Sequence, residues 1–170
     1  EYEFAYAEDI TERELAERKR KETLAFLQAA MNNSPAGIAI ADAPDGKLLY
    51  VNKAALGIRG GSQEELVNGV GIDEYVSSWQ ILHFDGTPYL PEEVPLARAI
   101  LFGETCDDVF IIHRPDQEER IVWANAAPIF NEDGDIMAGI VVFPDITELR
   151  QAEEEVKRIF DMSLDLICVA

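Results

Sequence analysis

The sequence predicts an α+β domain, a five-stranded antiparallel sheet with helices on one face, flanked by an N-terminal and a C-terminal linker helix. Two short apolar segments, at 37–41 and 47–51, are separated by turn residues and form an opening hairpin. Three longer segments, at 105–114, 120–130 and 136–143, are also separated by turns and form a closing meander. On both sides lie long stretches without Gly or Pro, which favour helices.

Short helices are expected between the hairpin and the meander. Asn52 is placed as the structural cap of a helix at 53–56, and 62–65 begins with a Ser followed by first-turn carboxylates. The segment 67–92 is rich in Gly, Asp and Pro and is predicted to be irregular. A helix is predicted at 92–102, entered through prolines and closed by a Gly.

Two motifs recur in the same order and suggest a tandem array. Asp9–Glu12 recurs as Asp145–Glu148, an offset of 136 positions (145 − 9). The segment 34–41 resembles 163–170, an offset of 129 (163 − 34). The repeat divides the chain into five parts: the tail of a preceding unit at 1–10, a linker helix at 11–33, one complete domain at 34–147, an output linker helix at 148–161 and the start of a following unit at 162–170.

Both linkers carry a heptad-like seam, which is typical of helices that pair with other helices. In the second linker the seam is largely apolar and consists of Ile146, Leu149, Glu153, Val156 and Phe160. In the first linker its first half is charged, and it consists of Ile10, Arg13, Glu17, Arg20, Leu24, Leu27 and Met31. We therefore expect self-association through the linkers, as a homodimer, with weak pairing in the first one. The alternative is a solvated amphipathic helix lying on its own domain.

The charge, cysteine content and apolar segments of the chain disfavour several classes of function. With 33 acidic and 14 basic residues the 170-residue chain has a net charge of −19. Such a surface disfavours binding to nucleic acid and direct contact with anionic membranes. The only cysteines, Cys106 and Cys168, form no disulfide framework, so a reducing compartment is the simpler interpretation. No apolar run approaches the roughly 20 residues needed to span a bilayer.

The sequence contains no catalytic constellation. Gly57, Gly60 and Gly61 do not form a dinucleotide-binding pattern, and no Ser, Cys or Lys lies in a nucleophile motif. Adjacent carboxylates such as Asp107 and Asp108 point to different sides of a strand, which disfavours an acid/base pair. We therefore predict that this chain is not an enzyme.

An ordered set of motifs resembles the PAS domain family over roughly 24–148. These motifs are Ser34–Ile38, Tyr50–Ala55, Asp85–Pro88, Leu96–Ala99, Gly103–Glu104, Asn125–Ile129, Asp133–Gly134 and Asp145–Glu148. The resemblance implies a cytoplasmic sensor or relay domain, with a cavity between helices and sheet that holds a small ligand, a cofactor or nothing. It also implies that Asp145, Ile146 and Thr147 couple the last strand to an output helix. The catalytic partner, a histidine kinase or a diguanylate cyclase, would lie in an output domain outside this chain, next to further PAS domains.

Strand alternation and the predicted helices give candidates for the cavity wall. These are Ile38, Ile40, Leu56, Leu66, Trp79, Leu96, Ile100, Phe110, Ile112 and Val141. Each of them is equally consistent with plain core packing. Trp79 and Tyr89 lie in the segment predicted to be irregular, where an aromatic side chain with a polar group needs both packing and a hydrogen-bond partner.

The cofactor of such a domain remains unknown from the sequence. A PAS haem sensor usually places its ligand on the helix that here spans 92–102, which has no His; His83 precedes it and His113 follows it. The flavin-bonding Gly-x-Asn-Cys-Arg-Phe type of motif is absent, and the His and Cys residues lack metal-site spacing. Haem, flavin and metal are each disfavoured, and a small organic ligand is left open.

Three functions compete at this point. The first is a sensory or relay module of a multidomain signalling protein, such as a sensor histidine kinase, that acts through its flanking helices. The second is a ligand-free structural spacer or dimerisation module in an array of such domains. The third is an enzyme, which the absence of catalytic motifs disfavours.

Overall fold

The computed structural model describes residues 2–167, with side chains described at 12–162. The chain divides after Ser34 into two units. The first is built on a single helix, α1 (Tyr2–Asn32), which contains no Gly or Pro. This helix confirms the predicted linker helix but begins earlier, within the segment that the repeat assigned to a preceding unit. That assignment stays a prediction.

The second unit contains one antiparallel sheet in the strand order β2-β1-β6-β5-β4-β3. Its strands are β1 (Gly37–Asp42), β2 (Leu48–Val51), β3 (Ile81–Leu82), β4 (Cys106–His113), β5 (Glu119–Phe130) and β6 (Ile136–Phe143). Five of these strands were predicted. The sixth, β3, pairs with β4 through two residues only and left no alternating pattern to detect.

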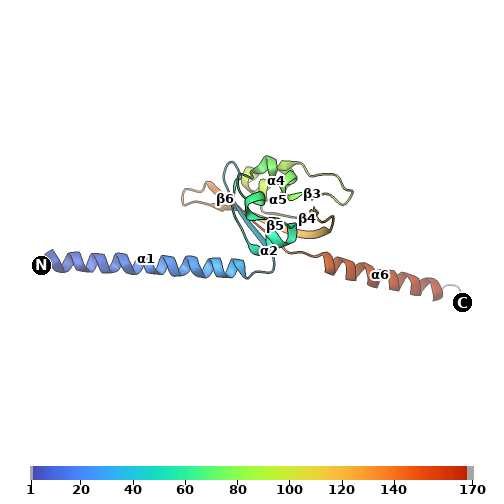
Figure 1. Ribbon diagram of the computed structural model, residues 1–170, viewed down its shortest axis with the longest axis horizontal. Coiled ribbons are helices and arrows are strands. Elements are labelled where there is room, and N and C mark those ends of the chain that lie inside the picture. The colour runs from blue at the N-terminus through green and yellow to red at the C-terminus, as the bar shows by residue number, and fades with distance from the viewer. Residues whose placement is uncertain (1, 168–170) are drawn as a thin grey trace. The chain divides into compact units, whose positions relative to one another are not determined.

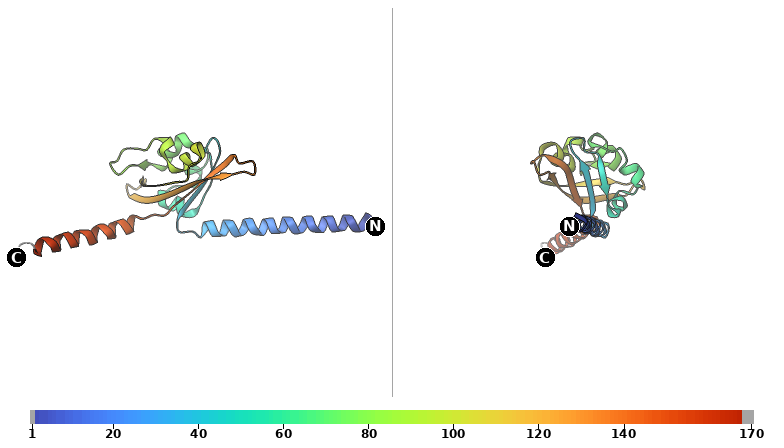
Figure 2. Two further views of the ribbon diagram at one scale, coloured as in Figure 1. Left: turned by 180° about the vertical axis from the view of Figure 1, so that it is seen from behind. Right: turned by 90° about the vertical axis from the view of Figure 1, so that its left-hand side faces the viewer.

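The helices between β2 and β4 are α2 (Lys53–Arg59), α3 (Gln63–Leu66), α4 (Ile72–Trp79), the 3-10 turn η1 (Pro91–Glu93) and α5 (Pro95–Phe102). Figure 1 and Figure 2 show α4 and α5 on the same side of the twisted sheet. Side chains of α2, α4 and α5 join those of the sheet in one buried apolar cluster. The predicted α+β architecture, with helices on one face, is confirmed.

Helix α4 corrects the prediction that 67–92 is irregular. Ile72, Tyr75, Val76 and Trp79 follow helical spacing, and Tyr75 and Trp79 are buried. The Glu74 carboxylate accepts a hydrogen bond from the Gly71 amide at 3.0 Å and closes the N-terminal turn. The helix is only eight residues long and lies among Gly and Asp residues, so its amphipathic pattern was easily missed.

Asn52 is confirmed as the structural cap of α2, and its side chain also bonds to the backbone at the start of β1. Its Oδ1 accepts hydrogen bonds from the amides of Ala55 and Ile38, each at 2.9 Å. Its Nδ2 donates to the Ala36 carbonyl at 2.9 Å. The side chain is fully buried, so these bonds both cap α2 and attach it to β1.

The last helix of the chain, α6 (Thr147–Ile167), follows β6 directly. It contains the predicted output linker at 148–161 and continues through the described part of the segment assigned to a following unit. Residues 168–170 of that segment lie outside the described residues. No described helix is long and apolar enough to cross a membrane.

Candidate functional site: a core cavity and the strand that leads from it to α6

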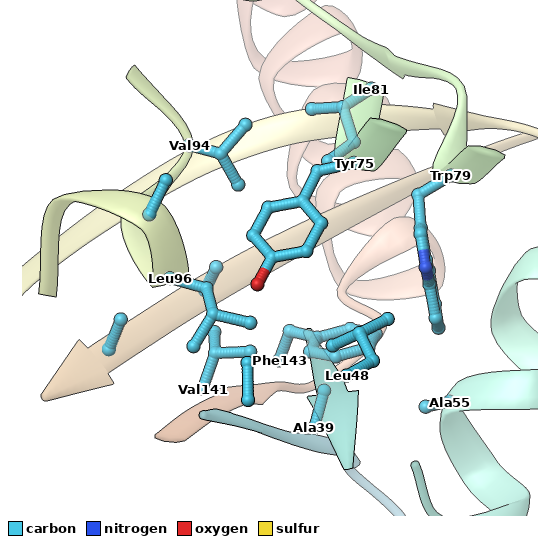
Figure 3. Close-up of a cluster of buried hydrophobic side chains, with 14 of the residues drawn as sticks. Ala39, Leu48, Ala55, Tyr75, Trp79, Ile81, Val94, Leu96, Val141 and Phe143 are labelled. Carbon is cyan, nitrogen blue, oxygen red and sulfur yellow. The ribbon is translucent and has the colours of Figure 1, made fainter. Parts of the chain in front are cut away.

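An apolar cavity of about 50 Å³ lies between the sheet and the helices. Figure 3 shows Tyr75 and Trp79 of α4 pointing toward the sheet residues Ala39 and Phe143. The wall comes from β1, β2, β3, β4, β5, β6, α4 and the start of α5. It consists of Ala39, Leu48, Tyr75, Trp79, Ile81, Val94, Pro95, Leu96, Phe110, Ile112, Ala124, Val141 and Phe143.

The two polar groups of the aromatic wall residues are occupied by backbone carbonyls. The Tyr75 hydroxyl donates to the Gly46 carbonyl, and the Trp79 Nε1 donates to the Leu66 carbonyl at 3.2 Å. Burial raises the pKa of the Tyr75 phenol well above its ordinary value, so the ring stays uncharged. Because these groups are satisfied elsewhere, the rings offer apolar surface to the cavity.

The sequence identified part of this wall. Trp79, Leu96, Phe110, Ile112 and Val141 line the cavity, and the other five candidates do not. The alternation in β1 was assigned to the wrong parity: Ala39 and Ala41 join the core cluster, whereas Ile38 and Ile40 alternate with them and lie on the other face.

The remaining three candidates pack beside the cavity. Leu66 is buried in the core cluster, and Leu56 is partly buried against it. Ile100 fills the space over Gly139, where an added Cβ would lie 2.7 Å from its Cγ1. A side chain at position 139 would therefore clash with α5, and this close approach of helix and strand leaves Ile100 in packed core.

Wall residues missed from the sequence have different origins. Ala39 would follow from the correct parity of β1. Phe143 lies on the same face of β6 as the predicted Val141, and Ala124 comes from β5, where no candidate was named. Tyr75 was missed because α4 was not predicted. Ile81, Val94 and Pro95 come from segments whose path depends on tertiary packing, and no local pattern marks them.

Tyr89 lies outside the cavity wall. Its ring stacks on His83, with centroids 3.8 Å apart, and its hydroxyl donates to the Asp108 carboxylate at 3.0 Å. Burial and the bond to Asp108 raise the pKa of the phenol. On the other side, the ring meets Phe110 edge-on at 5.6 Å, and Phe110 belongs to the cavity wall.

The predicted relay residues form a hydrogen-bonded junction with β5. The Thr147 hydroxyl accepts a hydrogen bond from the Ile121 amide at 2.9 Å, and the Ile146 amide donates to the Ile121 carbonyl at 2.8 Å. Both Thr147 polar groups donate to Asp145 Oδ1, the hydroxyl at 2.5 Å and the amide at 2.9 Å. Thr147 is 7% exposed, so its hydroxyl bonds are shielded from water.

Two further contacts hold the same junction. The Trp123 amide donates to the Pro144 carbonyl at 3.2 Å. The Arg120 guanidinium lies 3.7 Å from the Asp145 carboxylate and 2.6 Å from Glu118. β5 therefore holds the start of α6 at residues 120–123, and the same strand contributes Ala124 to the cavity wall.

Beyond the junction, α6 exposes large apolar side chains. These are Leu149, Val156, Ile159, Phe160 and Met162, each between 59% and 67% exposed. Leu149, Val156 and Phe160 belong to the predicted seam, and exposed side chains of this size in a seam are typical of a helix that pairs with another helix.

A family model described as PAS fold matches residues 31–151, most of the chain. The chain belongs to the PAS fold family. The match covers the whole sheet, the helices over it, and the junction with the start of α6. No curated protein matches the chain.

Solved structures show the same PAS fold. The PAS domain of an HTR-like protein from Haloarcula marismortui is 21% identical with a TM-score of 0.57, and the match covers 78% of this chain and 99% of that one. A sensory box histidine kinase/response regulator from Burkholderia thailandensis is 17% identical with a TM-score of 0.52, covering 82% and 97%. An RNA-binding light-oxygen-voltage receptor is 21% identical with a TM-score of 0.60, covering 81% of this chain but only 37% of that receptor.

The cofactors raised by the family resemblance do not fit this PAS domain as it stands. Pockets for ligands of drug size measure about 300 Å³ or more, whereas the cavity measures about 50 Å³. Its wall contains no His or Cys, so it offers neither an axial ligand for haem nor a thiol for flavin. Within the described residues, no group of three His, Cys, Asp or Glu side chains could hold a metal ion.

Proposed function

We propose that this PAS domain is a non-catalytic sensory relay of a multidomain signalling protein, which passes changes in its core to α6. One observation carries the proposal. The buried Thr147 hydroxyl, at the first residue of α6, accepts a hydrogen bond from Ile121 in β5, the strand that contributes Ala124 to the cavity wall. A displacement of β5 must therefore move the start of α6 or break this bond.

The cavity wall and the α6 junction are close together on β5, so a small displacement of the wall would be enough to reach the junction. Ile121 and Ala124 are three residues apart on one strand, and an extended strand rises about 3.3 Å per residue. β5 pairs along its length with β4 and β6, so it moves with the sheet. Packed elements respond to such strain by shifting between discrete arrangements.

The output end of the relay is the apolar seam of α6. A helix with Val156 and Phe160 exposed to water gains stability by pairing with a second copy. We propose a homodimer through this helix, continued into an output domain of the parent protein. The histidine kinase named among the similar structures is one class of protein with such an output domain.

A second candidate function is a spacer that maintains dimerisation without a ligand. It is favoured by the size of the cavity, which at about 50 Å³ is close to a filled core. In a spacer the junction would only hold α6 in place, and changes in the core would not reach it.

The junction can be tested by hydrogen–deuterium exchange on Thr147→Val, which keeps the shape of the side chain and removes the acceptor for Ile121. We expect faster exchange at Ile121 and in the first two turns of α6. The matched control is Thr23→Val, because the Thr23 hydroxyl donates to the Lys19 carbonyl at 2.9 Å on exposed α1. Unchanged exchange in α6 of Thr147→Val would refute the relay junction.

A further inference from the structure

The turn between α3 and α4 contains the pair Asn68 and Gly69. The chain has six asparagines, and Asn68 is the only one that a glycine follows. In such a pair the backbone nitrogen of the glycine can attack the side-chain carbonyl carbon of the asparagine, because glycine has no Cβ to block the approach. The attack closes a five-membered succinimide ring. In a folded chain it requires that both groups are free to meet.

Both reacting groups are free in this turn. Asn68 and Gly69 are exposed to solvent. Among the described residues, neither the Asn68 side chain nor the Gly69 amide has a hydrogen-bond partner. Gly69 has a φ of 76°, and apart from its chain neighbours no atom lies within 4 Å of the position that a Cβ would occupy. The ring can therefore close without displacing packed atoms.

Two other asparagines show what protection looks like. Asn52 is fully buried, and its Oδ1 accepts two backbone amides. Asn131 is exposed, but its Oδ1 accepts the amides of Asp133 at 3.0 Å and Asp135 at 2.9 Å. These bonds fix the side-chain carbonyl, and the next residue is a lysine or a glutamate, which hinders the attack. Asn68 differs from both in its neighbour and in its freedom.

We propose that Asn68 is a site of spontaneous deamidation, which converts it to aspartate or isoaspartate and loosens the turn into α4. The Gly69 nitrogen gives its proton to solvent and bonds to Cγ of Asn68, while the side-chain nitrogen takes up a proton and leaves as ammonia. Water then opens the succinimide at either of its two carbonyls. The net reaction consumes one water and releases one ammonia. This inference is independent of the proposed function.

The modified turn would hold the neighbouring core less well. Val70 is buried, and its carbonyl accepts a hydrogen bond from the Leu48 amide at 3.0 Å. Isoaspartate inserts a methylene group into the backbone and so lengthens the fixed spacing between consecutive Cα atoms. Either product also adds a negative charge next to Gly69, which lines a surface hollow with the carboxylates of Asp73 and Glu74. Both changes should destabilise the start of α4.

The site is tested by ageing the whole chain in mildly alkaline buffer and mapping its peptides by mass spectrometry. Aspartate and isoaspartate should accumulate at position 68 at least about tenfold faster than at Asn131, because only Asn68 has an unhindered glycine next to it. Gly69→Ala should slow the conversion. A free peptide spanning 63–73 is the reference for the unprotected reaction. If the peptide converts while Asn68 of the whole chain stays an amide, the folded turn protects it and the proposal is overturned.

The effect on the turn is measured by urea unfolding of fresh and aged chain. Aged chain that carries isoaspartate should unfold at a lower urea concentration than fresh chain. The matched control is Asn68→Gln, whose longer side chain disfavours ring closure and which should unfold alike before and after ageing. Equal unfolding of the fresh and the converted chain would overturn the claim that deamidation loosens the turn, and an equal loss in aged Asn68→Gln would assign the damage to another residue.

Discussion

The two linker helices occupy equivalent places in the repeat and differ in what their seams offer a partner. In α6 the seam begins at the anchored junction and presents Leu149, Val156 and Phe160. In α1 the equivalent positions, 136 residues earlier, are Arg13, Arg20 and Leu24. Charged residues at the seam resist burial, so the comparison predicts strong self-association through α6 and weak association through α1.

The largest expected effect is on dimerisation. Val156→Glu places a charge in the α6 seam of both copies and removes about 1.5–3 kcal/mol of apolar burial from each. The dimer dissociation constant should rise about 100-fold or more, measured by analytical ultracentrifugation. Arg20→Glu, at the equivalent position of α1, should change it by less than about threefold. If both variants raised the dissociation constant equally, the prediction that the chain associates mainly through α6 would be wrong.

Removing the hydroxyl of Thr147 and removing that of Thr23 should also have different effects on the free energy of unfolding. Thr147→Val leaves the shielded Ile121 amide without its acceptor and should lower the free energy of unfolding by about 1–3 kcal/mol. Thr23→Val, on exposed α1, should change it by about 0.5 kcal/mol or less. Urea unfolding measures both, and a loss below about 0.5 kcal/mol for Thr147→Val would contradict the buried junction.

The difference between the two linkers can also be tested by placing a valine in α1 at position 20, which corresponds to Val156 of α6. Arg20→Val replaces a seam charge with an apolar side chain and should strengthen self-association by about tenfold. The gain is limited because Arg13 and Glu17 remain in the seam. Arg18→Val, outside the seam, is the control and should have no comparable effect. If both variants strengthen association equally, the seam has no special role.

The smallest effect is expected at the partly exposed ion pair of the junction. Arg120→Gln removes the contact with Asp145 at 3.7 Å and should cost less than about 1 kcal/mol of unfolding free energy. The cost should shrink as salt screens the pair. Urea unfolding at low and high ionic strength tests this. A cost above about 2 kcal/mol, independent of salt, would show that Arg120 acts through packing instead.

Much of the fold could be predicted because it rests on local patterns: the turns between strands, the Gly-free linkers and the cap at Asn52. Five of the thirteen residues that line the cavity could be predicted for the same reason. The rest depends on packing. The parity of β1 is decided by which of its faces joins the buried core cluster under the helices, and both of its faces carry apolar residues, so alternation alone did not distinguish Ala39 from Ile38. Tyr75 required α4, whose short helical pattern lies in a stretch of loop-like composition.

The central claim is that the core communicates with α6 through β5, and it is tested most directly by changing the core and observing the junction. Val141→Ile alters the cavity wall, and ¹H–¹⁵N correlation spectra report Ile121, Thr147 and both helices separately. We predict shifts at Ala124, Ile121, Thr147 and the first turns of α6, and none in α1. Shifts confined to the cavity wall, with Ile121 and Thr147 unmoved, would contradict the relay and leave the domain a spacer.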